Sequence, residues 1–299
     1  MSANLARQPS HSLNLPTRLM KDAIPLHDAD LQRIARILDQ DAGIFVSMEK
    51  NSLVHSRLIK ILRTLNLSSF KEYCDLVEAP AGKELRREML MALTTNLTRF
   101  FREAHHFEHL LKEALPPLIA KAKLGERIRI WSAGCSNGQE PYSIAAIILS
   151  LLPEANNYDI KILASDIDCN MVAHGRIGMY SEEIAEKMPD NLRNKHFQKV
   201  TTENGIQYAA SERLKKLVSF RELNLNAVSW PMRGKFQIIF CRNVVIYFNA
   251  ETQKTLWNNF RDMLCGPGYL YIGHSERLSG QSVDKFESVG TTTYRLKTH

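Results

Sequence analysis

A glutamate lies where a nucleotide-binding turn would normally receive a phosphate. Residues 127–133 (RIRIWSA) are typical of a buried strand, and a turn from Gly134 to Gly138 separates them from an apolar helix that begins near Glu140. The turn matches neither GxGxxG nor GxxxxGK[ST]. A carboxylate at a helix start is favoured by the helix dipole but would repel a pyrophosphate. The residue therefore either stabilises its own helix or marks a phosphate-free nucleoside site.

A second acid follows the next predicted strand. Residues 159–166 (DIKILASD) end in Asp166, the position where dinucleotide-binding folds place an acid on the ribose hydroxyls. Ligands of doubly wound sheets bind at the carboxyl ends of the strands, so Asp166 and Glu140 belong to one candidate site. An acid at a strand end is common, but the two acids together favour a positively charged nucleoside. S-adenosylmethionine, with its ribose, sulfonium and amino-acid group, is such a ligand.

The sequence indicates neither a metal site nor a covalent nucleophile. The five cysteines stand far apart without a CxxC pair, which argues against zinc or a disulfide framework and suits a reducing cytoplasm. His105, His106 and His109 lack the HExxH arrangement, and adjacent histidines diverge by about 100° on a helix. We interpret them as ordinary helix residues, with a metal site as the minor alternative, and expect no metal ion.

The elements that must position these residues alternate between strands and helices from Arg127 onward. Such alternation predicts an α/β fold with a doubly wound, mostly parallel sheet and right-handed crossovers. The predicted helices cover 142–152, 169–175 and 251–264. The predicted strands cover 127–133, 159–166, 217–223, 236–241, 268–274 and 291–297.

A segment at about 178–216 interrupts this alternation. Its first half (EEIAEKMPDNLRNKHF) is predicted to be helical, and its second half contains Asn204-Gly205, a strong signal for a hairpin turn. We therefore expect a small inserted antiparallel β-subdomain.

The chain before the α/β region divides into two parts. Residues 1–25 are polar and typical of a flexible tail, and residues 26–94 are predicted to form a helical N-terminal domain. The α/β domain would then cover 95–299, including the insert. The longest apolar run, Ile144 to Leu152, is far too short to span a bilayer, and the first twenty residues show no secretory signal.

One predicted helix of the N-terminal domain, NSLVHSRLIKILRTL, is basic on one side. Its apolar face consists of Val54, Leu58, Ile61, Leu62 and Leu65. Its opposite face consists of Arg57, Lys60 and Arg63, without an acid nearby. Such a face is either simply solvated or a docking surface. The net charge of +7 favours an acidic partner, either nucleic acid or an acidic protein surface.

Several stretches of the chain carry a family resemblance in combination. They are TTNLTRFFREAHHF, WSAGCSNGQEPYSIA, ASDID, FRELNL, FCRNVVIYF and GYLYIGHSERL. In this order, and over nearly the whole chain after the tail, they resemble the CheR family of chemotaxis receptor glutamate methyltransferases. The family turn usually has two adjacent acids, whereas the first position here is Gln139. The resemblance implies a small all-α domain followed by a Rossmann-like methyltransferase domain with a β-subdomain insert.

The resemblance also implies roles for individual residues. Arg102 and Tyr247 would position the acceptor carboxylate near the reactive methyl group, without acting as general bases. The residues implied to bind S-adenosylmethionine, or its product S-adenosylhomocysteine, are Asn96, Thr98, Arg102, Glu140, Asp166, Asn224, Leu225, Arg242 and Asn243. From the residues alone, Asn224 could instead cap a turn, Arg242 could form an ordinary ion pair, and Tyr247 could fill the core.

By the same resemblance, the substrates are glutamates on the cytoplasmic methylation helices of chemoreceptors. The clustered acids of those helices would meet the basic face of Arg57, Lys60 and Arg63. We expect a cytoplasmic protein that is recruited to membrane receptor clusters, with a receptor C-terminal peptide as a further partner at the β-subdomain. We expect neither nucleic-acid binding nor membrane insertion.

Two functions from other classes remain as alternatives. The basic isoelectric point, near 9.1, favours a nucleic-acid methyltransferase. Amide and exocyclic-amine methylases, however, usually carry [DNS]PP[YFW] where this chain reads CRNVVIYF. The other alternative is a non-catalytic module that binds the cofactor and docks partners.

Overall fold

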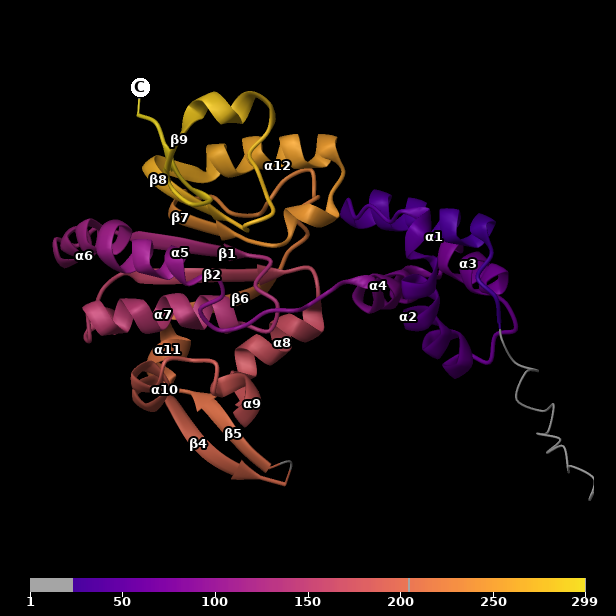
Figure 1. Cartoon of the computed structure of the whole chain (residues 1–299), viewed down its shortest axis with the longest axis horizontal. Helices are drawn as coiled ribbons and strands as arrows, with labels where there is room; N and C mark the ends of the chain where they lie inside the picture. The colour runs from indigo at the N-terminus through magenta and orange to yellow at the C-terminus, as the bar shows by residue number, and fades with distance from the viewer. Residues whose placement is uncertain (1–23, 204, 299) are drawn as a thin grey trace, which may run out of the picture.

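The computed structural model describes residues 24–203 and 205–298 (Figure 1). The predicted tail at 1–25 therefore falls almost wholly outside the described residues, as does Asn204 of the predicted hairpin turn. In Figure 1 the N-terminal helices form a group beside the α/β part, and one extended segment joins the two. Within the described ranges, no helix is long and apolar enough to cross a membrane.

The N-terminal part is all α-helical and has its own core. Its elements are α1 (Asp28–Ala42), the 3₁₀ turn η2 (Met48–Lys50), α2 (Asn51–Thr64), α3 (Phe70–Glu78) and α4 (Lys83–Leu93). The predicted apolar face of α2 is buried at Val54, Leu58, Ile61 and Leu62. Leu65 lies just beyond the end of the helix and is 37% exposed, so its predicted place in the core is wrong.

The α/β part is built on a seven-stranded sheet. Its strands are β1 (Ile128–Ala133), β2 (Ile160–Asp166), β6 (Val218–Glu222), β7 (Phe236–Cys241), β8 (Leu264–Ile272), β9 (Phe286–Gly290) and β10 (Thr293–Leu296). In the order β6-β2-β1-β7-β8-β10-β9, the first five strands are parallel, and β10 is antiparallel to both neighbours. The predicted fold class is confirmed. β9 has no predicted counterpart, because FESVG is short and mostly polar.

Alternate residues of the central strands pack against helices on opposite faces of this sheet. Ile130 and Ile238 share a core with α7 and with the helical segment that precedes β1. Trp131 and Ile239 face the other way and pack with α12. The helices and turns of this part are α5 (Ala104–His109), the π-helical η3 (Leu110–Ala114), α6 (Leu115–Lys123), α7 (Gln139–Leu151), η4 (Ala155–Asn157), α8 (Cys169–Ile177), η5 (Val245–Tyr247), α12 (Ala250–Met263) and η6 (Gly280–Lys285). Burial on both faces explains the nearly continuous apolar character of β7.

The segment expected at about 178–216 forms a second, smaller sheet. Its strands β3 (Met179–Ser181), β5 (Gly205–Ala210) and β4 (Phe197–Thr202) are antiparallel and adjacent in that order. The helices of this segment are α9 (Glu182–Ala185), α10 (Asp190–His196) and α11 (Glu212–Leu217). The predicted antiparallel β-subdomain is confirmed, and β4 forms one edge of its sheet.

The helical and α/β parts touch close to the carboxyl ends of the parallel strands. Ile44, just after α1, forms an antiparallel bridge with Phe248, and Phe45 N donates a hydrogen bond to Tyr247 O at 2.8 Å. Asn249 Nδ2 donates to Asp39 Oδ1 of α1 at 3.0 Å. These contacts bring the end of α1 beside the segment that follows β7.

Candidate cofactor and active site

A cleft opens at the carboxyl ends of β1, β2 and β7, where doubly wound sheets bind their ligands. It contains about 1000 Å³ of open space, and both parts of the molecule line it. Ten residues that the sequence implied for the cofactor and the acceptor line this one cleft: Asn96, Thr98, Arg102, Glu140, Asp166, Asn224, Leu225, Arg242, Asn243 and Tyr247. The structure thus brings these residues together, while their individual roles stay predictions.

The turn after β1 approaches the cleft with its backbone. Gly134 and Gly138 adopt positive φ angles of 80° and 92°, and Ser136 is also left-handed, with φ 49°. Gly134 N donates to Ser165 O of β2 at 2.8 Å. A Cβ atom on Gly134 would lie 2.3 Å from Val244 Cγ2, on the opposite side of the turn. Gly134 is therefore required on both conformational and steric grounds.

Asp166, at the end of β2, is held in place by backbone donors. Its Oδ2 accepts from Ser136 N at 2.7 Å, and its Oδ1 accepts from Asp168 N at 3.0 Å. Burial raises the pKa of Asp166, and the hydrogen bonds from these two amides oppose the shift. Asn96 Nδ2 in turn donates to Asp168 Oδ2 at 2.8 Å. The segment between the two domains is therefore hydrogen-bonded to the turn that follows β2, next to Asp166, the candidate for binding the ribose.

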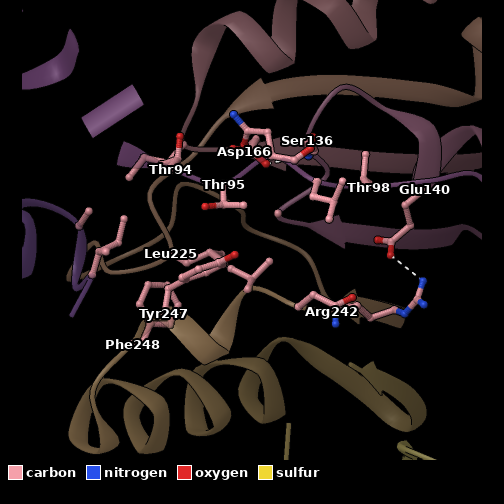
Figure 2. Close-up of a pocket in the computed structure, with 18 of the residues that line it drawn as sticks. Thr94, Thr95, Thr98, Ser136, Glu140, Asp166, Leu225, Arg242, Tyr247 and Phe248 are labelled. Atoms are coloured by element: carbon pink, nitrogen blue, oxygen red, sulfur yellow. Dashed lines mark hydrogen bonds and ion pairs between the residues drawn. The ribbon is translucent and has the colours of Figure 1, made fainter. Parts of the chain in front are cut away.

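Arg242 lies between two carboxylates in another part of the cleft. Its side chain is 2% exposed; Nη1 donates to Glu140 Oε2 at 3.1 Å, and Nη2 lies 3.2 Å from Glu103 Oε2. Figure 2 shows the pair of Glu140 and Arg242 at the end of the cleft away from Tyr247. The ion-pair alternative for Arg242 is thus observed, and the pair fixes the carboxylate that the sequence singled out.

The pKa values of the two carboxylates that flank Arg242 shift in opposite directions. Burial raises the pKa of Glu140, although Arg242 and the hydroxyl of Ser132, which donates to Glu140 Oε1 at 2.7 Å, oppose the shift. For Glu103, burial also acts upward, but Arg242 and His274 outweigh it and lower the pKa to about 2. Glu103 therefore stays ionised at every physiological pH.

Arg102 and Tyr247 reach the cleft from distant parts of the sequence. Arg102 Nη1 donates to Leu97 O at 3.0 Å, within the segment that joins the two domains. Tyr247 ends the turn η5, and Figure 2 shows it beside Leu225 and Phe248. Both side chains line the cleft.

Asn224 and Asn243 of the cleft differ in how their polar atoms are used. Asn224 Oδ1 accepts from Asn226 N at 2.9 Å, and its Nδ2 donates to Asp41 O of α1 at 2.6 Å. The turn-capping alternative for Asn224 is thus observed, at a position that also lines the cleft. Asn243 is left-handed with φ 60°, and its buried Oδ1 has no hydrogen-bond partner among the described residues.

The charges of the cleft fit S-adenosylmethionine. At one end of the cleft Arg242 lies between Glu103 and Glu140, so this triad carries one net negative charge. The rest of the lining includes Asp166, Arg99 and Arg102. The ligand carries a sulfonium and an ammonium group against a single carboxylate, so its positive groups are complementary to this triad.

The basic face of α2 differs from the prediction. Lys60 and Arg63 are exposed, but Arg57 is half-buried, and its Nη1 donates to the carbonyl oxygens of Leu93 and Thr94 at 2.9 and 2.7 Å. These carbonyls end α4, where a helix leaves its last acceptors without internal donors. The expectation of three projecting cations is therefore corrected to two, because Arg57 caps a neighbouring helix.

Histidines that could suggest a metal site are engaged in other contacts. Glu103, His105 and His106 place potential ligand atoms within 4.8 Å of one another. Glu103 is already neutralised by Arg242, and His106 Nε2 lies 2.9 Å from Thr292 Oγ1. Burial and the charge of Arg242 lower the pKa of His106 to about 3. The guanidinium would repel a metal ion here, and the absence of a metal stays a prediction.

Sequence reasoning missed Glu103, Ser136 and Ile44 as parts of the site. Glu103 and Ser136 stand beside predicted site residues, but an acid before a helix and a serine in a turn are too common to mark a contact. Ile44 lines the cleft only because the helical part bridges to Phe248. No local pattern could have placed it there.

The fold and the cleft together define an S-adenosylmethionine-dependent methyltransferase. A family model described as "CheR methyltransferase, SAM binding domain" matches residues 96–295, and one described as "CheR methyltransferase, all-alpha domain" matches residues 29–94. The chain belongs to the CheR methyltransferase family.

Individual relatives agree with the family model over most of their length. The chain is 52% identical to a "Probable chemotaxis protein methyltransferase" of Rhizobium etli, over 86% of this chain and 96% of that protein. It is 39% identical to "Chemotaxis protein methyltransferase 2" of Pseudomonas aeruginosa, over 89% and 92%. It is 36% identical to the "Chemotaxis protein methyltransferase" of Escherichia coli, over 93% and 94%. The predicted family and the predicted cofactor are confirmed.

Proposed function

We propose that this protein transfers the methyl group of S-adenosylmethionine to glutamate side chains of chemotaxis receptors, forming glutamyl methyl esters in the adaptation step of chemotaxis signalling. One observation carries the proposal: residues from separate stretches of the sequence line a single cleft at the carboxyl ends of the sheet. The relatives that the chain resembles are named chemotaxis protein methyltransferases, which supports the same substrate class.

The reaction requires no general base from the protein. A glutamate carboxylate has a reference pKa of about 4.3, so the acceptor is already ionised at neutral pH. When bound, the cofactor supplies an activated methyl group on its sulfonium. The chain must supply alignment, which can contribute about 7–11 kcal/mol in favourable cases, and must exclude water. We assign the alignment of the acceptor to Arg102 and Tyr247, which both line the cleft.

The remaining cleft residues are assigned to parts of the cofactor. Asp166 receives the ribose hydroxyls, and Glu140 with Asn243 receives the amino-acid end. Arg242 acts mainly by holding Glu140, because its guanidinium is already engaged with carboxylates. The other residues of this assignment, next to the adenine or on the segment between the domains, are Asn224, Leu225, Asn96 and Thr98.

We assign the docking of the methylation helices to α2. Lys60 and Arg63 are exposed on the side of α2 opposite its buried face. The methylation helices carry clustered glutamates, so the two surfaces have opposite charge. Exposed charge pairs are individually weak, and their joint effect is mainly on the rate of encounter.

We further propose that a receptor C-terminal peptide binds the small sheet. β4 is an edge strand of that sheet, and an edge strand presents backbone donors and acceptors to which an extended peptide can add as a further strand. Such a tether would bring a cytoplasmic enzyme to receptor clusters at the membrane.

Labelled S-adenosylmethionine tests the proposed function directly. The protein is incubated with receptor-bearing membranes, and in parallel with RNA and DNA. Base-labile label on the receptor is the expected result, because methyl esters hydrolyse in mild base. Label on nucleic acid would instead support a nucleic-acid methyltransferase. Cofactor binding without any transfer would leave a non-catalytic docking module.

A further inference from the structure

We propose that Glu103 is a positioning residue that holds Arg242, Asn243 and the backbone of Arg102 in the geometry needed for methyl transfer, an inference that rests on the function proposed above. Glu103 does not line the cleft itself. It stands behind the residues that do, and it acts through them.

The carboxylate of Glu103 contacts two separate turns, one after β7 and one after β8. Oε2 lies 3.2 Å from Arg242 Nη2, after β7. Oε1 accepts from His274 N at 3.3 Å and lies 3.1 Å from His274 Nδ1, after β8. Asn243 Nδ2 donates to the same Oε1 at 3.5 Å. The side chain of Glu103 is 10% exposed and that of Arg242 is 2% exposed, so this pair is largely shielded from solvent, whereas His274 is exposed.

The backbone around Arg102 needs such support. Phe101 and Glu103, on either side of Arg102, both adopt left-handed conformations, with φ 51° and 57°. Side chains other than glycine rarely adopt this region, and such strain persists only where surrounding contacts enforce it. Phe101 N donates to Ser143 Oγ of α7 at 3.1 Å. On the other side, Arg242 Nη2 donates to Arg102 O.

These contacts form a closed link between the strained segment and the cofactor site. The side chain of Glu103 pairs with Arg242, and Arg242 in turn bonds the carbonyl oxygen of the residue just before Glu103. Arg242 also holds Glu140, the candidate for the amino-acid end of the cofactor. Removing the charge of Glu103 would free one side of Arg242, and would loosen Arg102, Glu140 and Asn243 together.

Glu103 also determines the charge of this end of the cleft. With Glu103 the triad carries one net negative charge, and without it Arg242 and Glu140 cancel. A neutral triad attracts a sulfonium less. The loss of affinity on removing this charge should therefore be at least as large for S-adenosylmethionine as for S-adenosylhomocysteine, which has lost its sulfonium.

The test compares Glu103→Gln with Glu108→Gln in the full chain. Glu108 carries the same group five residues further along, but its side chain is 67% exposed. S-adenosylhomocysteine affinity is measured by calorimetry, and kcat is measured with receptor at saturating cofactor, both well below the midpoint of thermal unfolding. We expect Glu103→Gln to weaken product binding about 10-fold and to lower kcat by about 10- to 100-fold, the range for losing a charged hydrogen-bonding partner. Glu108→Gln should leave both constants unchanged.

A lowered unfolding midpoint with both constants at their wild-type values would make Glu103 merely structural and would overturn the proposal. A double-mutant cycle with Arg242→Met adds a second criterion. If Glu103 acts through Arg242, the double variant should bind the product no more weakly than Arg242→Met alone. Effects that multiply would show that Glu103 acts independently of Arg242, and would overturn the part of the proposal that runs through Arg242.

The binding measurement separates this inference from the proposed function. If the wild-type protein transferred no label to receptors, the proposed substrate would be wrong. Calorimetry with S-adenosylhomocysteine would still decide whether Glu103 positions Arg242, because it needs no receptor.

Discussion

Charged side chains gather in two regions of this molecule, and the two regions differ in what surrounds each charge. In the cleft, Arg242 is 2% exposed and lies within 3.2 Å of two carboxylates. On α2, Lys60 and Arg63 project into solvent. Buried charges are strongly coupled to their partners, whereas exposed charges act through a field that salt screens. We infer that the cleft determines binding constants and turnover, and that α2 determines the rate of encounter.

The largest expected effect is that of Arg242→Met. This change leaves Glu103 and Glu140 buried without their shared cation, and removing one partner of such a pair typically lowers the free energy of unfolding by about 3–5 kcal/mol. Urea denaturation at pH 7 measures the loss. Arg127→Met, at a side chain that is 74% exposed, is the matched control and should change stability by no more than about 0.5 kcal/mol.

The pH dependence of the same variant adds a second check. In the wild type the pKa of Glu103 is lowered to about 2, so its ion pair stabilises the fold above the unfolded pKa and is lost as pH falls. In the variant the unpaired carboxylates have raised pKa values, so their ionisation destabilises the fold as pH rises. The stability difference between the two proteins should therefore shrink between pH 7 and pH 4. A difference that stayed constant with pH would mean that the loss is one of packing.

Asp166→Ala should have the next largest effect. A charged acceptor that binds ribose hydroxyls contributes about 1.5–3 kcal/mol, so the affinity for S-adenosylhomocysteine should fall by that amount in calorimetry. Asp159→Ala, at an exposed acid near the amino end of β2, serves as the control. Unchanged affinity in a folded Asp166 variant would remove this residue from the site.

Arg57→Ala should affect stability rather than encounter. The change removes hydrogen bonds from a charged donor to the carbonyl oxygens of Leu93 and Thr94, and should lower the free energy of unfolding by about 1–2 kcal/mol. Lys60→Ala, one turn further along α2, should lower it by no more than about 0.5 kcal/mol. Equal losses in thermal or urea unfolding would show that Arg57 does not support the end of α4.

The smallest effect is expected for the double variant Lys60→Glu with Arg63→Glu. Two exposed cations contribute little individually, so kcat/KM for the receptor should fall roughly two- to fivefold at low salt. Its dependence on salt should become flatter, because the favourable field is removed. Product affinity and unfolding should not change. Methylation at the wild-type rate at low ionic strength would mean that this face of α2 is simply solvated.

The residues of the cleft could be predicted because the fold constrains them. Glu140 and Asp166 follow two strands of one parallel sheet, and the carboxyl ends of such strands meet at a single edge. Family motifs supplied the others, including Asn96 and Tyr247. The strand at 286–290 could not be predicted, because its short polar sequence pairs only through the tertiary position of β10.

The errors on α2 and beside Arg102 share a physical cause. Arg57 was expected on a solvent face because it falls among the polar positions of the helix. The carbonyl oxygens that it binds, however, lie at the end of α4, more than thirty residues away in sequence. Glu103 likewise gains its partners Arg242 and His274 from distant turns. Periodicity describes only the neighbours along one helix, so long-range partners of charged side chains escape it.

The bridge between Ile44 and Phe248 has a consequence for how the protein unfolds. Because the helical part supplies some lining residues of the cleft, among them Ala42, Ile44 and Leu93, and the remainder of the chain supplies the others, a ligand in the cleft is released when either part opens. A ligand present at 100 times its Kd adds about 2.7 kcal/mol to the stability of the assembled pair, and adds nothing to either part alone. Binding of the cofactor therefore stabilises the association of the two parts. Scanning calorimetry should show the two parts melting as one cooperative unit when S-adenosylhomocysteine is bound, with the helical part melting earlier when it is not.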